Sequence, residues 1–147
     1  MANEIPEPKS VAPTLSREEV LDWLRSGKRV VGRDFVLVDV RRNDFEGGTI
    51  RGSLNLPAQS LFLTLPTIYN VLAATQVRDV VFYCGSSRGR GPRTAGWFAD
   101  YLADKQGHSL KSWVLEGGIK GWVKAGPEYT AWMDGYEATV WENLEER

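Results

Sequence analysis

One loop of the sequence combines residue types that suit nucleophilic chemistry on an anion. Cys84 and Arg90 enclose five residues of glycine, serine and arginine, and Gly91 and Pro92 follow at once. A glycine-rich turn of this kind points backbone N–H groups inward as an anion-binding nest, and the start of a following helix supplies further free N–H groups. Such groups favour the thiolate form of a cysteine, and an arginine can bind a tetrahedral oxyanion through two parallel hydrogen bonds.

These residue types predict a role for each position of the loop. Cys84 is predicted to be the nucleophile, and Arg90 is predicted to close the loop on the oxyanion. The residues between them are predicted to bind the oxyanion: Gly85, Ser86, Ser87, Arg88 and Gly89. The glycines would let the backbone turn sharply and approach the ligand. The alternative is structural, because a cysteine that ends an apolar strand is commonly a small buried hydrophobic residue.

The chain contains a single cysteine and a single histidine. One cysteine excludes an intramolecular disulfide and a multi-cysteine zinc site. We also expect no bound metal and no other bound cofactor. The same count favours a reducing compartment, the cytoplasm or alternatively the nucleus. Any redox cycle at Cys84 must therefore take its second thiol from outside the chain.

The composition limits the class of protein. The chain has 147 residues, with 18 basic and 19 acidic side chains and a net charge of -1. This length predicts one domain, and the charge balance argues against a general nucleic-acid binder. No stretch approaches the roughly 20 apolar residues of a membrane span. Residues 1–14 hold three prolines and little apolar content, so we expect a flexible tail there and a folded domain over residues 15–147.

Strands and helices are predicted to alternate along the chain. Ser16 and Glu19 form a capping box at the start of a helix that Gly27 ends. Short apolar runs predict strands at residues 35–40, 53–56, 79–84 and 112–115. Helical spacing predicts helices at residues 58–75, with a break or kink at Pro66, and at residues 91–105 and 119–124. From residue 128 we expect a final helix or an irregular wrap. The pattern predicts an α/β fold with a mostly parallel central sheet flanked by helices.

The ends of the predicted strands carry further candidate residues. Ligands of such sheets lie beyond the carboxyl ends of the strands, and Asp39, Cys84 and Glu116 lie at or just past such ends. Asp39 and Arg41 are interpreted as an ion pair that supports the site, with a catalytic acid role for Asp39 as the alternative. His108 is expected to have no role.

Three segments give the sequence a family resemblance. Residues 83–93 resemble the active-site loop of the rhodanese-like phosphatases, namely the M-phase inducer dual-specificity phosphatases and the eukaryotic arsenate reductases. Residues 38–41 and 45–57 resemble the N-terminal rhodanese signature, and residues 115–122 resemble the C-terminal one. The resemblance implies a single rhodanese-like domain. It also implies an external glutathione as reductant, glutaredoxin as a partner, and a small oxyanion (arsenate or phosphate) or a phosphoprotein as substrate.

The departures from that pattern bear on the reaction. Tyr83 stands where these families place a histidine, and the loop contains no carboxylate. A phosphatase gains from a general acid that protonates its leaving group, whereas arsenate brings its own proton. We therefore expect a thiol-dependent arsenate reductase, with a protein tyrosine or dual-specificity phosphatase that forms a phosphocysteine as the alternative. A sulfurtransferase is less favoured because the active-site loop of the sulfurtransferases that share this resemblance is one residue shorter. A non-catalytic binding module is less favoured because Cys84 and Arg90 are both present.

Overall fold

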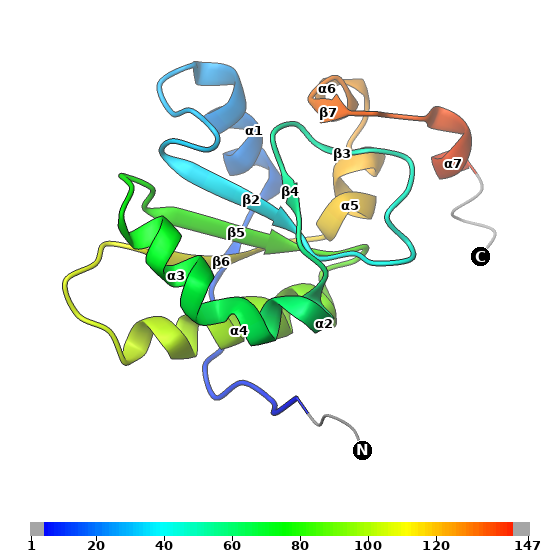
Figure 1. Ribbon diagram of the computed structural model, residues 1–147. Helices are drawn as coiled ribbons and strands as arrows, with labels where there is room; N and C mark the ends of the chain where they lie inside the picture. The colour runs from blue at the N-terminus through cyan, green and yellow to red at the C-terminus, as the bar shows by residue number, and fades with distance from the viewer. Residues whose placement is uncertain (1–4, 143–147) are drawn as a thin grey trace.

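A parallel β-sheet forms the centre of the computed structural model, which describes residues 5–142 (Figure 1). Its strands are, in sheet order, β1 (Thr14–Leu15), β6 (Lys111–Leu115), β5 (Asp79–Tyr83), β2 (Phe35–Asp39) and β4 (Leu54–Asn55). Each neighbouring pair runs parallel. A separate antiparallel pair joins β3 (Thr49–Ile50) to β7 (Met133–Asp134). The predicted α/β fold with a mostly parallel sheet is confirmed.

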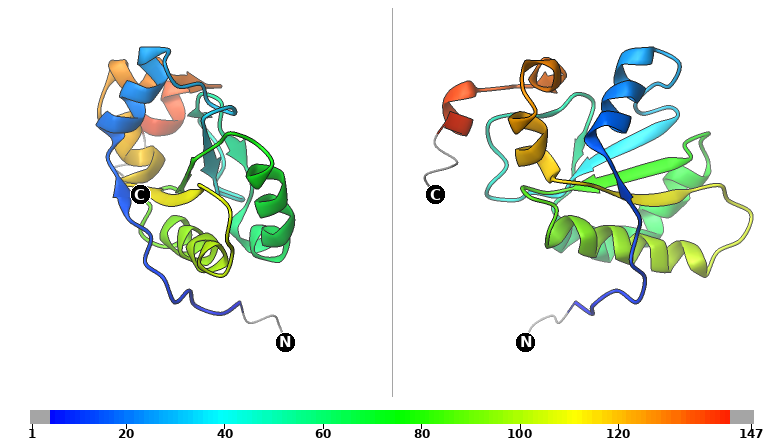
Figure 2. Two further views of the ribbon diagram at one scale, coloured as in Figure 1. Left: turned by 90° about the vertical axis from the view of Figure 1, so that its left-hand side faces the viewer. Right: turned by 180° about the vertical axis from the view of Figure 1, so that it is seen from behind.

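Helices cover both faces of the sheet (Figure 2). On one face lie α2 (Ala58–Leu61), a 3₁₀ turn (Phe62–Thr64), α3 (Leu65–Ala73) and α4 (Arg90–Ala103). On the other face lie α1 (Arg17–Ser26), α5 (Gly118–Lys124) and α6 (Pro127–Thr130). The last element, α7 (Ala138–Glu142), packs on the loop after β2, where the indole N–H of Trp141 donates to the carbonyl of Gly47 at 2.7 Å. The two layers explain why the central strands are apolar on both faces.

The side chains of β2 show how the core divides. Val36 and Val38 belong to a buried cluster that includes Phe98 of α4. Phe35 and Leu37 belong to a second buried cluster on the opposite face. Successive side chains of a strand point to opposite faces, so one continuous apolar run supplies both clusters.

Two local predictions from the sequence are confirmed by the geometry of the helix ends. The Ser16 hydroxyl accepts a hydrogen bond from the backbone N–H of Glu19 at 3.2 Å, and Gly27 ends α1 with a left-handed φ of 72°. The predicted interruption at Pro66 is also present. Pro66 lies in the first turn of α3, where its missing N–H has no helical partner to lose, so it begins a new helix after the 3₁₀ turn.

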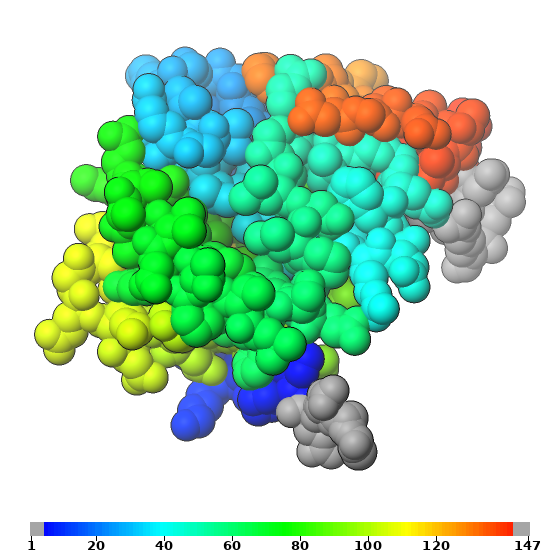
Figure 3. Space-filling model, in the orientation of Figure 1, coloured from blue at the N-terminus to red at the C-terminus, as the bar shows by residue number. Residues whose placement is uncertain are grey.

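The prediction of a flexible tail over residues 1–14 is wrong for residues 5–14, and its first four residues lie outside the described residues. The first described residues lie at the bottom of the molecule in Figure 3, and the carbonyl of Pro6 accepts the indole N–H of Trp97 of α4 at 2.8 Å. The Asp100 carboxylate accepts the backbone N–H groups of Lys9 and Ser10, each at 2.8 Å. Composition alone did not reveal these contacts, because they join residues about 90 positions apart.

The N-terminal segment then completes the sheet. β1 pairs with β6 in parallel, and the flanking backbone continues the ladder. The N–H of Val114 donates to the carbonyl of Pro13, and the N–H of Glu116 donates to the carbonyl of Leu15, each at 2.9 Å. The folded domain therefore begins before residue 15, the predicted boundary.

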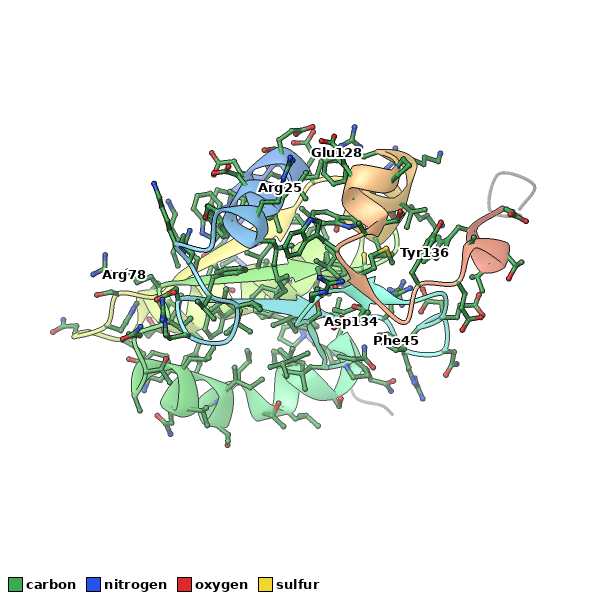
Figure 4. All side chains as sticks on the ribbon, turned by 90° about the horizontal axis from the view of Figure 1, so that it is seen from above. Arg25, Phe45, Arg78, Glu128, Asp134 and Tyr136 are labelled. Atoms are coloured by element: carbon green, nitrogen blue, oxygen red, sulfur yellow. The ribbon has the colours of Figure 1, made fainter. Side chains whose placement is uncertain are left out.

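The C-terminal part forms a wrap of short elements rather than one final helix. α6, β7 and α7 follow one another, and the last five residues of the chain lie outside the described residues. Arg25 of α1 and Glu128 of α6 lie side by side in Figure 4, with Nη1 and Oε1 3.4 Å apart. No helix within residues 5–142 combines the length and apolar character that a membrane crossing requires.

Candidate active site

The loop between β5 and α4 surrounds the sulfur of Cys84. The backbone N–H of Ser87 donates to Sγ at 3.2 Å, and the N–H of Gly91 donates to it at 3.3 Å. The cysteine is buried, with 2% of its surface exposed. The loop therefore places Sγ beside two backbone donors at the carboxyl end of the sheet, an arrangement that suits the nucleophile role predicted for Cys84.

The sharp turn of this loop falls at a serine. Ser87 has a φ of 57°, in the left-handed region, whereas Gly85 and Gly89 do not adopt positive φ. The hydroxyl of Ser87 accepts the N–H of Cys84 at 3.4 Å. The left-handed residue of the loop is therefore Ser87, in a conformation that is uncommon for residues other than glycine.

The first residues of α5 hold the loop between β5 and α4 through backbone hydrogen bonds. The N–H of Ile119 donates to the carbonyl of Cys84 at 3.0 Å, and the N–H of Lys120 donates to the carbonyl of Gly85 at 2.9 Å. Gly118, just before these two donors, has a φ of 59°, and a Cβ built there would lie 2.5 Å from the carbonyl oxygen of Cys84. Only glycine fits this conformation and this close approach.

Arg90 is paired with a carboxylate that sequence reasoning missed. Its Nη1 and Nη2 groups donate to the Asp44 carboxylate at 2.7 and 2.6 Å. The two hydrogen bonds from Arg90 hold the pKa of Asp44 well below its usual range, and the same pairing raises the pKa of Arg90. A signal was present, because Asp44 follows β2 and β2 is the neighbour of β5, so their carboxyl ends lie at one edge.

The other two arginines of this segment, Arg88 and Arg93, differ in their surroundings. Arg93 forms an ion pair with Glu7 at 3.0 Å. Arg88 is exposed and has no hydrogen-bond or ion-pair partner among residues 5–142. Gly89 caps α4, and its carbonyl accepts the N–H of Arg93 at 3.1 Å. Ser86 is half-buried and lies beside Arg88 on the outer side of the loop.

Asp39 and Arg41 form a buried ion pair below the site. Nη2 of Arg41 lies 2.8 Å from Oδ2 of Asp39, and their side chains are 2% and 0% exposed. Arg41 also donates to the carbonyls of Glu46 at 3.1 Å and Gly48 at 2.8 Å, so the pair holds the loop that carries Asp44. This geometry matches the supporting role and not the catalytic one, because the carboxylate oxygens of Asp39 already face Arg41 and Thr49.

Tyr83 points away from the loop, into the opposite core cluster. Its hydroxyl lies 2.7 Å from the hydroxyl of Thr49 and 2.6 Å from that of Ser53, and it accepts the N–H of Ile50 at 3.2 Å. Burial raises the pKa of Tyr83, and the charge of Asp39 adds to the shift. The residue that replaces the histidine of related loops is therefore a neutral structural group.

A small hollow of about 130 Å³ lies over the loop. The residues that line it include Gly85, Asp44 and Lys120. A Cβ placed on Gly85 would be 3.6 Å from Cε of Lys120 and 3.9 Å from Nη2 of Arg90. The part of the chain that the structure describes holds no cluster of His, Cys, Asp and Glu placed to bind a metal ion. The hollow is thus small, and its lining combines the cation of Lys120 with the carboxylate of Asp44.

Comparison with known proteins agrees with this arrangement. The family described as Rhodanese-like domain matches residues 16–125. The chain belongs to this family. The rhodanese-like domain is 34% identical over 116 residues to Arsenate reductase 2.1 of rice, which covers 76% of this chain and 68% of the relative. It is 30% identical over 97 residues to Arsenical-resistance protein 2 of Saccharomyces cerevisiae, with 61% of this chain and 75% of the relative covered.

A solved structure supports the same assignment. The rhodanese-like domain superposes on Ygr203w, described as a yeast protein tyrosine phosphatase of the Rhodanese family, with a TM-score of 0.73 and 25% identity. The match covers 90% of this chain and 98% of the other. The resemblance expected from the three sequence segments is confirmed.

Proposed function

We propose that this rhodanese-like domain reduces arsenate with external thiols through Cys84. The observation that carries the proposal is the pair of backbone N–H groups, those of Ser87 and Gly91, that donate to Sγ at a seven-residue loop ending in Arg90. Such donors stabilise a thiolate and then the negative oxygens of a tetrahedral oxyanion bonded to it. The similarity to proteins named for arsenate reduction and arsenical resistance supports the choice of substrate.

The reaction proceeds in three balanced steps. The thiolate sulfur of Cys84 attacks the arsenic of dihydrogen arsenate, an S–As bond forms, and one arsenate hydroxyl leaves as water after it takes the proton of the other hydroxyl. A first external thiol then attacks the sulfur of Cys84. An S–S bond forms, the S–As bond breaks with its electron pair left on arsenic, and arsenious acid is released after protonation. A second thiol reduces the mixed disulfide and restores Cys84.

Arsenate is favoured over a phosphoester because of the state of Asp44. A phosphatase needs a neutral acid near the leaving oxygen. Asp44 faces Arg90, and their hydrogen bonds hold the pKa of Asp44 low, so its carboxyl is ionised and cannot donate a proton at neutral pH. Arsenate releases water from its own hydroxyl and needs no such acid.

The reductant in this proposal is glutathione, and glutaredoxin is the protein that removes glutathione from the mixed disulfide. The support is the single cysteine, because no other thiol of the chain can reduce an oxidised Cys84. Free thiols of this kind are abundant in a reducing compartment, so the proposal locates the activity in the cytoplasm or alternatively in the nucleus.

A phosphatase is the second candidate. The support is the similarity to the yeast tyrosine phosphatase, and phosphate has the same shape and charge as arsenate, so the loop amides and Arg90 suit both. In that reaction the sulfur of Cys84 attacks phosphorus and an alkoxide or phenoxide leaves. A phosphoprotein or a small phosphate ester would then be the substrate.

A side-by-side assay separates the candidates. Wild type and Cys84→Ser are assayed on arsenate with glutathione and glutaredoxin, on p-nitrophenyl phosphate, and on thiosulfate with cyanide, after circular dichroism shows that both proteins are folded. We expect arsenate turnover in wild type alone. Arsenate turnover no faster than that of Cys84→Ser would refute the proposal, and phosphate release in wild type alone would favour the second candidate.

A further inference from the structure

The Asp44 carboxylate occupies the part of Arg90 that an oxyanion would use. Nη1 of Arg90 donates to Oδ1 of Asp44 at 2.7 Å, and Nη2 donates to Oδ2 at 2.6 Å. Two parallel hydrogen bonds from one guanidinium to two oxygens are also the geometry in which arginine binds a tetrahedral oxyanion. An oxyanion that takes these two N–H groups therefore has to replace Asp44.

The pair of Asp44 and Arg90 lies against the nucleophile loop. Gly85 directly follows Cys84 in the chain. A Cβ built on Gly85 would lie 3.9 Å from Nη2 of Arg90 and 4.0 Å from Oδ2 of Asp44. A carboxylate oxygen of Asp44 therefore approaches the residue next to the nucleophile, together with the guanidinium that it holds.

This pair is exposed enough to open. The side chains of Arg90 and Asp44 are 40% and 49% exposed, whereas those of Arg41 and Asp39 nearby are 2% and 0% exposed. Separation of the buried pair would leave two charges without water, which is costly. Water can solvate both charges of the exposed pair, so this pair contributes little to folding and can exchange partners.

The backbone holds Asp44 close to Arg90 while the side chain exchanges. The carbonyl of Asp44 accepts a hydrogen bond from Nη1 of the buried Arg41 at 3.4 Å. Oδ1 of Asp44 also accepts the backbone N–H of Arg42 at 3.2 Å. The charge of the carboxylate persists, because the hydrogen bonds from Arg90 hold the pKa of Asp44 well below its usual range. A charged carboxylate thus stays within reach of Arg90 at neutral pH.

We propose that Asp44 is an internal competitor for Arg90 and that it weakens the binding of oxyanions at the nucleophile loop. The inference rests on the proposed function in one respect, the oxyanion-binding role of Arg90. No covalent bond changes in the exchange. Two N–H···O hydrogen bonds to the carboxylate are replaced by two to the oxyanion, so Asp44 is a positioning residue that acts through Arg90.

The size of the effect follows from the fraction of Arg90 that is free. The apparent affinity of a ligand falls in proportion to the fraction of the protein that can bind it. An exposed pair that favours its closed form by about 1 kcal/mol leaves about one Arg90 in six free. Removal of the Asp44 carboxylate should therefore tighten oxyanion binding about sixfold.

Equilibrium binding tests the proposal without turnover. Arsenate, and inorganic phosphate in a second series, is titrated by calorimetry into Cys84→Ser and into Cys84→Ser/Asp44→Asn. We expect each anion to bind about sixfold more tightly to the second protein, in which asparagine keeps an acceptor for the N–H of Arg42. Glu128→Gln in Cys84→Ser is the matched control, because Glu128 is an exposed carboxylate whose partner is Arg25 of α1. Equal affinities of the Asp44→Asn and Glu128→Gln proteins would overturn the proposal, and so would undetectable binding to all three.

A double-mutant cycle tests whether Asp44 acts through Arg90. Phosphate binding is followed by phosphorus NMR, which detects weak affinities, with Arg90→Gln added to Cys84→Ser and to Cys84→Ser/Asp44→Asn. We expect no gain from Asp44→Asn in this background, because no guanidinium is left to compete for. Undetectable binding to both proteins would also support the proposal, since affinity would then depend on the guanidinium. A sixfold gain without Arg90 would overturn it, because Asp44 would then repel the anion directly.

Steady-state kinetics separates this proposal from the proposed function. In arsenate reduction with glutathione and glutaredoxin, Asp44→Asn should lower the KM for arsenate about sixfold, with a smaller effect on kcat. A lower kcat at an unchanged KM would overturn the proposal, because Asp44 would then serve the chemical step. No arsenate turnover in wild type would refute the proposed function, while the titrations would still decide whether Asp44 competes for Arg90.

Discussion

The contact between Gly118 and the nucleophile loop allows a stringent test of how the site is held. Gly118→Ala adds one methyl group at a residue with a φ of 59°, pointed at the carbonyl oxygens of Cys84 and Gly85 at 2.5 and 2.6 Å. Gly27→Ala is the matched control. Gly27 has a φ of 72°, and a Cβ there meets nothing within 4 Å. Both variants impose a left-handed alanine, but only one of them displaces the loop.

The magnitudes follow from these distances. A left-handed alanine costs about 1 kcal/mol, which is all that we expect from Gly27→Ala. In Gly118→Ala the oxygen of Cys84 must also move by about 0.9 Å to restore an ordinary contact of 3.4 Å, and overpacking of this kind adds roughly 1–3 kcal/mol. Because a shift near 1 Å at a reacting group can reduce the rate by about 100-fold, we expect a loss of that order in kcat/KM.

Two measurements check this reasoning. Denaturant unfolding gives the free energy of unfolding of wild type and both variants, and the arsenate assay gives kcat/KM under conditions where each protein is folded. Gly27→Ala should retain full activity with a small loss of stability. Equal stabilities and equal activities for the two variants would refute the claim that the close approach of Gly118 positions the loop.

Three further substitutions test other contacts. Arg90→Lys should raise the KM for arsenate by at least about tenfold without lowering the unfolding midpoint, since a hydrogen bond to a charged group contributes roughly 1.5–3 kcal/mol; an unchanged KM would contradict an oxyanion-binding role. Asp39→Asn leaves Arg41 buried without its counter-charge and should cost about 3–5 kcal/mol in denaturant unfolding, whereas a loss under about 1 kcal/mol would show that the pair does not support the loop. Burial raises the pKa of Tyr83 above its ordinary value of 10.0, so near pH 10 the unfolded chain releases the phenol proton and the folded chain keeps it. The free energy of unfolding of wild type should therefore fall as the pH rises above 10. Tyr83→Phe should lose less over the same interval in pH-dependent unfolding, and parallel pH profiles would contradict this.

Much of the fold could be predicted because local sequence patterns determine it. The N-cap at Ser16 and the apolar run at residues 35–40 depend on near neighbours in the chain, and both have the expected structures. The N-terminal segment was not predicted, because its order comes from contacts with Trp97 and Asp100, about 90 residues away. Such contacts leave no local pattern in the sequence.

The same division applies to the site. The spacing of Cys84 and Arg90 predicts one continuous loop, and the structure brings both residues to the carboxyl end of β5. Asp44 was missed because its pairing with Arg90 joins two loops that are neighbours only in the sheet. The left-handed conformation of Ser87 was not predicted, because it accompanies hydrogen bonds with Cys84 that residue type alone does not reveal.

The short strand β1 has a consequence for the behaviour of shortened forms of this protein. Its backbone, with Pro13, receives the N–H groups of Val114 and Glu116, so β6 is covered on that side. Removal of residues 1–15 would leave β6 as an edge strand with unpaired donors, and such edges are templates for aggregation. A truncated protein should therefore form β-rich aggregates at concentrations where the whole chain remains dispersed, which light scattering and thioflavin fluorescence would reveal.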